Sequence, residues 1–130
     1  MNLLDENIPR LQWEWLRQAG IPVRQIGFEF AYSSIADDSI LVLLHRVKRV
    51  TFFTQDRDFF QWRLCHRAYC LVKLDVDPDD TGEYIRRFLR QPGFKTEAER
   101  LGKVVRVHAD GIQFWVTRSA RRNRERWLKR

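Results

Sequence analysis

Short runs of β-branched and aromatic residues alternate along this chain with longer segments in which apolar residues recur at helical spacing. The short runs predict strands over residues 2–4, 23–26, 50–54, 68–74, 103–108 and 112–118. The longer segments predict helices over residues 9–19, 37–47, 79–90 and 96–101, and a short helix ending at residue 64. Because strands that alternate with helices build βαβ units, the pattern predicts one α/β domain with a central, mainly parallel sheet.

Two of the predicted helices carry an apolar face, and the last two predicted strands are joined by a turn. Within residues 9–19, Leu11, Trp15 and Leu16 form an apolar stripe, and Gly20 follows as a stop signal. Between residues 108 and 112 the Ala-Asp-Gly segment predicts the turn of a C-terminal β-hairpin. The apolar face of the helix over residues 37–47 consists of Ile40, Leu41, Leu44 and Val47.

Basic residues concentrate at the C-terminus. Residues 118–130 hold seven Lys or Arg against one Glu, a net charge of +6, whereas the other 117 residues hold 17 basic and 16 acidic side chains. We therefore divide the chain into a domain over residues 1–117 and a basic tail over residues 118–130. Such a tail attracts phosphates through counterion release. A solubilising terminus and a segment that docks an acidic protein are the open alternatives.

Several classes of protein are disfavoured by the sequence. No apolar run approaches the roughly 20 residues of a membrane span, and no basic segment followed by an apolar one marks secretion, so we expect a cytoplasmic protein without a membrane partner. Cys65, His66 and Cys70 lack a fourth zinc ligand at a recognised spacing, which favours reduced, structural cysteines. The acidic run over residues 75–80 has the Asp and Pro content of a turn and helix cap.

Another set of acids follows the predicted strands. Asp5 comes after the first strand, Asp56 and Asp58 come after the third, and Asp37 opens the helix between the second and third strands. In open α/β sheets, functional residues gather beyond the carboxyl ends of the strands. Carboxylates brought together there repel one another unless a divalent cation lies between them, and oxygen ligands suit Mg²⁺ or Mn²⁺. Each Asp taken alone also suits a helix cap.

These acids lie in three motifs that carry a resemblance to a known family. The motifs are Leu-Leu-Asp-Glu-Asn over residues 3–7, Ala-Asp-Asp-Ser-Ile-Leu over residues 36–41 and Thr-Gln-Asp-Arg-Asp-Phe over residues 54–59. In this order and spacing the chain resembles the PIN-domain superfamily, and within it a compact group of uncharacterised prokaryotic proteins related to VapBC-type toxin ribonucleases. The resemblance spans the chain and implies a three-layer α/β/α fold with a C-terminal hairpin.

The resemblance also implies roles for individual residues. Asn7 would hydrogen-bond within the site, and Thr54 would orient a carboxylate or a metal-bound water. Full-length PIN toxins carry a further acid on a helical insertion that this chain lacks, and Glu6 and Asp38 are the candidates to replace it. The implied metal ligands and catalytic residues are Asp5, Asp37, Asp56 and Asp58.

Two classes of function follow from these residues. The first is a Mg²⁺- or Mn²⁺-dependent endoribonuclease acting on single-stranded RNA, as a toxin with an antitoxin partner and as a homodimer. Trp62, beside the third motif, could stack on a base of that RNA. The second is a PIN-like module that binds a protein or RNA without cleaving it. The candidate nucleic-acid contacts are Arg57, Arg118, Arg121 and Arg122.

Overall fold

The computed structural model describes residues 1–27 and 37–127, with the side chains of Asp37 and Asp38 excepted. The strands are β1 (Asn2–Leu4), β2 (Arg24–Gln25), β3 (Val50–Thr54), β4 (Tyr69–Leu74), β5 (Lys103–His108), β6 (Gly111–Val116) and β7 (Ser119–Arg126). The α-helices are α1 (Arg10–Gln18), α2 (Asp37–Val47), α3 (Thr81–Arg90) and α4 (Glu97–Arg100). Three short 3₁₀ helices are η1 (Arg57–Phe59), η2 (Trp62–Leu64) and η3 (Pro78–Asp80).

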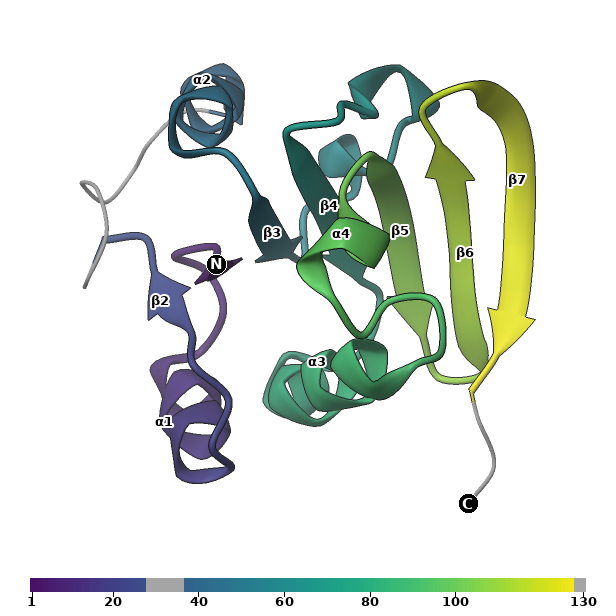
Figure 1. Ribbon diagram of the computed structural model, residues 1–130. Helices are drawn as coiled ribbons and strands as arrows, with labels where there is room; N and C mark the ends of the chain where they lie inside the picture. The colour runs from purple at the N-terminus through teal and green to yellow at the C-terminus, as the bar shows by residue number, and fades with distance from the viewer. Residues whose placement is uncertain (28–36, 128–130) are drawn as a thin grey trace.

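The strands form one mixed sheet in the order β2-β1-β3-β4-β5-β6-β7 (Figure 1). The strands from β2 to β5 pair in parallel, and β6 and β7 add to the far side in antiparallel pairing. Parallel neighbours need a crossover connection, and α1 joins β1 to β2 while α3 and α4 join β4 to β5. The protein is therefore an α/β protein, as the alternating sequence pattern predicts.

Each face of the sheet has its own hydrophobic core, because successive side chains of a strand point to opposite faces. On one face, Phe53 of β3, Val72 of β4 and Val105 of β5 pack with Leu16 of α1 and Phe88 of α3. The other core is built mainly from Leu3, Phe52, Leu71 and Val104 of the sheet, Ile40 and Leu44 of α2, and Phe59 of η1. Helices thus cover both faces of the parallel part of the sheet.

Helix α1 is rotated relative to the sequence prediction. Leu16 is fully buried, but Leu11 is 72% exposed and Trp15 is 38% exposed, so the predicted burial of Leu11 is wrong. The cause is the contact with α3, where the Gly82 N–H donates a 2.8 Å hydrogen bond to Gln12 Oε1. A Cβ at Gly82 would lie 2.8 Å from the Trp15 ring, so glycine allows this close approach. Polar Gln12 therefore faces the domain and Leu11 faces solvent.

Helix α2 follows the predicted apolar face except at its last residue. Ile40 and Leu44 are buried and Leu41 packs against the same core, whereas Val47 is 37% exposed. The helix ends there because Lys48 and Arg49 have φ values of 62° and 57°, in the left-handed region. This turn leads the chain directly into β3.

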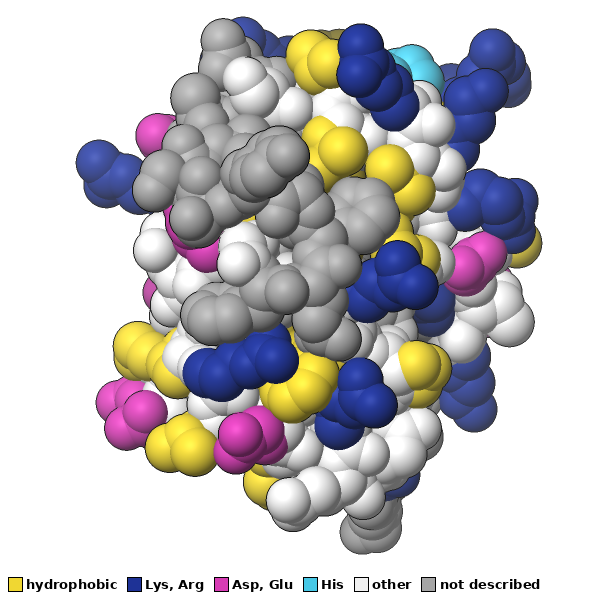
Figure 2. All heavy atoms as spheres, turned by 90° about the vertical axis from the view of Figure 1, so that its left-hand side faces the viewer, with side chains coloured by type: hydrophobic (Ala, Val, Ile, Leu, Met, Phe, Trp, Pro, Cys, Tyr) yellow, Lys and Arg dark blue, Asp and Glu magenta, His cyan; other side chains and the backbone are white. Residues whose placement is uncertain are grey.

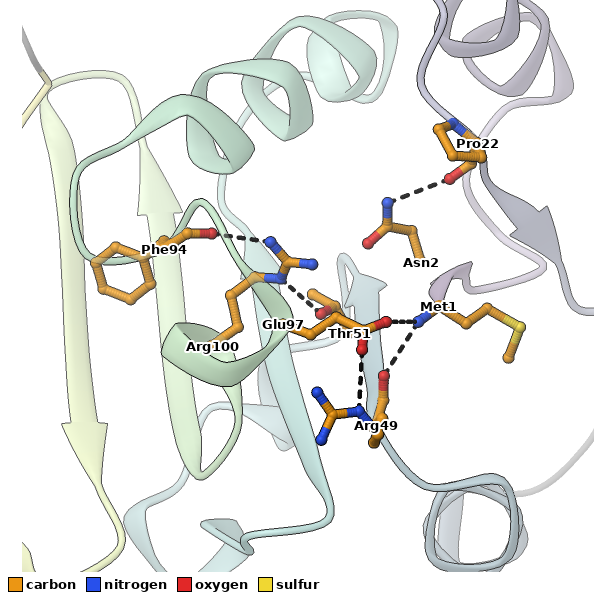
Figure 3. A network of polar contacts seen from close by, with 8 residues as sticks. All are labelled: Met1, Asn2, Pro22, Arg49, Thr51, Phe94, Glu97 and Arg100. Atoms are coloured by element: carbon orange, nitrogen blue, oxygen red, sulfur yellow. Dashed lines mark hydrogen bonds and ion pairs between the residues drawn. The ribbon is translucent and has the colours of Figure 1, made fainter.

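Polar contacts tie α4 to the sheet at the end where β1 and β3 begin (Figure 3). Arg100 is 6% exposed, and its guanidinium donates 2.9 Å hydrogen bonds to Thr51 Oγ1 and to the Phe94 carbonyl. Glu97 accepts a 2.7 Å hydrogen bond from the Met1 ammonium group. Burial lowers the pKa of Arg100, which nevertheless keeps hydrogen-bond partners for its charge. These contacts stabilise the end of the sheet opposite the acidic residues described below.

The basic C-terminal segment is part of the sheet, and its assignment to a tail is wrong for residues 119–126. These residues form β7, which pairs with β6 along most of its length. Gln91 Nε2 adds hydrogen bonds to Glu125 Oε1 (3.2 Å) and to the Arg126 carbonyl (3.1 Å). The strand could not be predicted from composition, because an edge strand with charged side chains lacks the apolar residues of a central strand. Such charges also discourage pairing with another sheet.

The structure confirms the turn and helix cap in the acidic run over residues 75–80, and it places Cys70 in the core. Burial raises the pKa of the Cys70 thiol to about 12, and both cysteines are free. In the acidic run, Asp77 Oδ1 accepts a 2.9 Å hydrogen bond from the Asp79 N–H and caps η3.

No helix within the described parts of the chain is long and apolar enough to cross a membrane. Acidic and basic side chains are interspersed on the face that Figure 2 shows.

Candidate metal site at the carboxyl ends of β1 and β3

The parallel pairing of β1 and β3 brings Asp5 next to Thr54. Leu4 and Phe53 are aligned in the two strands, and the Asp5 N–H continues the ladder with a 2.9 Å hydrogen bond to the Phe53 carbonyl. The Thr54 hydroxyl donates a 2.7 Å hydrogen bond to Asp5 Oδ2, and both side chains are buried. Two of the predicted site residues are therefore in direct contact.

Asp56 and Asp58 extend this contact into a chain of hydrogen bonds. The Asp56 N–H donates to Thr54 Oγ1 at 3.0 Å, and Asp56 Oδ1 accepts from the Asp58 N–H at 2.9 Å. Asp56 is half-buried and forms the N-cap of η1, whereas Asp58 is exposed in its first turn. The third motif thus serves as a helix cap and also places the Asp56 carboxylate beside the Asp5 site.

The Asp5 carboxyl has a raised pKa. Desolvation by burial is the largest cause, and the negative charges of Glu6 and Asp56 add to it. Hydrogen bonds from the Thr54 hydroxyl and the Glu6 backbone act in the opposite direction. Only 7% of Asp5 is exposed, so water compensates its charge poorly. Burial therefore makes ionisation of Asp5 less favourable than that of a solvent-exposed aspartate, and a nearby positive charge would offset this cost.

Gln25 supports the loop that carries Asp5, a role that the sequence analysis did not predict. Its Nε2 donates to the carbonyl oxygens of Asp5 (3.1 Å) and Ile8 (2.7 Å), and its Oε1 accepts from Arg10 Nη1 at 3.3 Å. The Gln25 side chain is fully buried. A glutamine within the predicted strand over residues 23–26 does not by itself indicate which backbone groups it binds.

The supporting residues of the first motif differ in their environments. Glu6 is half-buried, and its charge contributes to the raised pKa of Asp5, so the two carboxylates lie near each other. Asn7 is exposed, and no hydrogen bond joins its side chain to the residues described in the structure. Its predicted hydrogen bond within the site stays a prediction.

The two acids of the second motif are described only by their backbone. Asp37 and Asp38 are the first residues of α2, and their side chains lie outside what the structure describes. Within the described part of the chain, no three His, Cys, Asp or Glu side chains are grouped closely enough to hold a metal ion. The assignment of Asp37 as a ligand therefore stays a prediction.

The chemical type of the described donors suits a hard divalent cation. They are carboxylate oxygens, the type of ligand that Mg²⁺ and Mn²⁺ prefer. Asp5 is buried beside two further acids, and a cation would offset both the lost hydration and the mutual repulsion. One oxygen of Asp5 and one of Asp56 are already fixed by hydrogen bonds, which reduces the entropy lost on binding.

The candidate nucleic-acid contacts are all exposed. Arg57 lies in η1 between the two acids of the third motif. Arg122 of β7 lies over the Trp115 ring, with 5.0 Å between its guanidinium carbon and the ring centroid. Trp62 is 43% exposed, and its Nε1 donates to the Val116 carbonyl at 3.3 Å. The other two candidates, Arg118 and Arg121, lie in and just after the turn between β6 and β7.

Comparisons with protein-family models, with curated proteins and with solved structures found no match to this chain.

Proposed function

We propose that this protein is a metal-dependent endoribonuclease of the PIN type that acts on single-stranded RNA. The observation that supports this most is the Asp5 carboxylate, which is buried beside Glu6 and Asp56 and has a raised pKa. Helix capping does not account for Asp5, because the N-cap of the following helix α1 is Pro9. Buried acids with perturbed pKa values are more typical of functional sites.

The arrangement of the sheet and helices is compatible with the proposed PIN-like, three-layer fold. Helices α1 and α3 lie on one face of the parallel strands and α2 lies on the other. The acids lie beyond the carboxyl ends of β1 and β3, where α/β proteins commonly bind ligands. The antiparallel strands β5 and β6 would correspond to the C-terminal hairpin of the family.

In the proposed reaction, a bound Mg²⁺ or Mn²⁺ would supply an activated water and neutralise the charge that develops on the phosphate. Asp5 and Asp56 would hold the ion, with Asp37, Asp58 and the supporting acids Glu6 and Asp38 completing its surroundings. Thr54 keeps one Asp5 oxygen fixed through its 2.7 Å hydrogen bond. Burial of Asp5 excludes water from that side of the site.

The resemblance adds partners to the proposal. A toxin of the VapBC type would be encoded beside a small antitoxin, which would cover the acids with an Arg or Lys side chain. A second copy of the chain would form a homodimer. The cytoplasm would be the site of action on RNA.

Cleavage of a labelled single-stranded RNA in the presence of Mn²⁺ tests the proposal. We expect cleavage by the wild type, loss of cleavage by Asp56→Asn, and full activity of the control Asp80→Asn. Asp80 is exposed and makes no side-chain cap hydrogen bond, so its substitution makes the same chemical change outside the site. Equal cleavage by the wild type and Asp56→Asn would place the activity elsewhere. RNA binding without cleavage would instead favour the PIN-like binding module.

A further inference from the structure

A straight row of polar side chains crosses the sheet from the candidate metal site to its far edge. Thr54 of β3 pairs with Lys73 of β4, and Lys73 pairs with Arg106 of β5. Arg106 pairs with Gln113 of β6, and Gln113 pairs with Arg124 of β7. Directly paired residues point to the same face of a sheet. These five side chains, which we call the cross-strand row, therefore share one face.

The face that carries the cross-strand row is the one packed against α2 and η1. Leu71 and Val104 precede Lys73 and Arg106 by two residues and belong to the core on that face. Neighbouring strands are about 4.8 Å apart, so four strand-to-strand steps place Arg124 about 19 Å from Thr54. The row thus begins at the hydroxyl that holds Asp5 and extends far beyond the site.

The row is positively charged, and one carboxylate contacts two of its cations, Lys73 and Arg106. Asp75 Oδ2 accepts a 2.6 Å hydrogen bond from Arg106 Nη2, and Asp75 Oδ1 lies 3.1 Å from Lys73 Nζ. Arg106 Nη1 also donates to Gln113 Oε1 at 3.2 Å, so the Gln113 amide oxygen, and not its N–H groups, faces Arg106. Three cations, including exposed Arg124, stand against a single acid, so the row keeps a net positive charge.

Aromatic side chains border the row on the same face. Phe60 and Trp115 are 4.4 Å apart between ring centroids, and both pack against the core of this face. The Arg122 guanidinium lies over both rings. Trp62 follows in η2 and is 43% exposed. Cations that follow a line, with rings beside them, are the combination that binds single-stranded nucleic acids.

We propose that the cross-strand row binds the phosphate backbone of single-stranded RNA and leads it to the carboxylates at Asp5, while the bordering rings contact its bases. This inference rests on the proposed nuclease function and assigns its substrate-binding surface to Lys73, Arg106, Gln113 and Arg124. An acidic protein that added a strand to β7 would use the backbone at the sheet edge. The row instead presents its charges from the face of the sheet, which favours a polyphosphate chain.

Equilibrium binding of a fluorescent 20-nucleotide RNA, measured by anisotropy in EDTA, tests the row without any cleavage. Arg124→Gln and the control Arg90→Gln would both be made in the Asp56→Asn background. Arg90 is exposed on α3, which covers the opposite face, so both variants lose one surface charge. Loss of one phosphate contact should reduce the slope of log K against log salt by about 0.7 and weaken binding about 5-fold at 0.1 M salt. Arg90→Gln should leave both values unchanged.

Three outcomes would overturn the inference. The first is equal binding by Arg124→Gln and Arg90→Gln, with Arg122→Gln also unchanged. The second is an equal KM for Mn²⁺-dependent RNA cleavage by the wild type and by the single variant Arg124→Gln. The third is competition by poly-glutamate of equal charge as strong as that by RNA, which would assign the row to an acidic protein. Weaker RNA binding by Arg124→Gln without cleavage by the wild type would support the row and reject the nuclease. Thermal melting of each variant verifies that it is folded.

Discussion

Replacing Thr54 by valine removes a hydroxyl from the candidate site while keeping the shape of a fully buried side chain. The hydroxyl donates to Asp5 Oδ2 at 2.7 Å and accepts from the Asp56 N–H at 3.0 Å. A hydrogen bond to an ionised group contributes about 1.5–3 kcal/mol, and the added methyl recovers part of that loss through burial. We expect Thr54→Val to lower the free energy of unfolding by about 2 kcal/mol at pH 7.

The stability lost in Thr54→Val should depend on pH, because the Thr54 hydrogen bond lowers the pKa of Asp5 whereas burial raises it. Without that bond, the folded-state pKa of Asp5 rises further above its ordinary value of 3.8, while the unfolded value stays the same. A carboxyl with a raised folded pKa contributes stability at low pH that is lost as the pH rises through the folded pKa. As the pH rises, the free energy of unfolding falls more for Thr54→Val than for the wild type. The difference between the two proteins should therefore grow from pH 4 to pH 8.

Urea unfolding followed by tryptophan fluorescence at several pH values measures this deficit. Thr54→Ser is the matched control, since it keeps the hydroxyl and loses only a methyl group, at a cost of about 1 kcal/mol that does not vary with pH. A Thr54→Val deficit that is the same at pH 4 and pH 8 would refute the interpretation that the hydroxyl stabilises an ionised Asp5.

Three further predictions concern single side chains. Asp5→Asn should raise the free energy of unfolding of the metal-free protein by about 1 kcal/mol at pH 7, because it removes a buried charge; the gain should shrink as the pH falls, and urea unfolding that shows a less stable variant would contradict it. Arg100→Lys should lower the free energy of unfolding by about 2 kcal/mol, because an ammonium group cannot replace the guanidinium bonds to both Thr51 and Phe94; RNA cleavage should persist, and lost cleavage in a folded variant would reject a purely structural role. Cys70, whose thiol pKa is about 12, should resist alkylation at pH 8 until the protein unfolds, and mass spectrometry showing rapid native labelling would disprove its burial.

That Asp5 lies beside the end of the third strand could be anticipated from sequence, because Asp5 and Asp56 both follow strands predicted to be parallel. The apolar runs that form β1 and β3 fix where each strand stops, and the parallel pairing then places Asp5 beside Thr54. The bounds of α2 were also predicted correctly, since its apolar residues recur at helical spacing. These features depend on local pattern and on one general rule about strand ends.

Features that depend on tertiary contacts could not be predicted in this way. The rotation of α1 follows from the contact of Gln12 with Gly82, 70 positions later in the chain. The strand β7 is stabilised by pairing with β6 and not by its own apolar content. The cross-strand row exists only because β4, β5, β6 and β7 pair in one particular register, and a shift of one residue would move each side chain to the opposite face.

A Mn²⁺ titration followed by thermal melting tests the central claim, that Asp5 and Asp56 form a divalent-cation site. A ligand that binds only the folded state adds about 2.7 kcal/mol of stability at 100 times its Kd. We expect Tm to rise with Mn²⁺ in the wild type and in the control Asp80→Asn, and to stay constant in Asp5→Asn and Asp56→Asn. A Tm that does not change with Mn²⁺ in the wild type, or that rises equally in all four proteins, would contradict the claim.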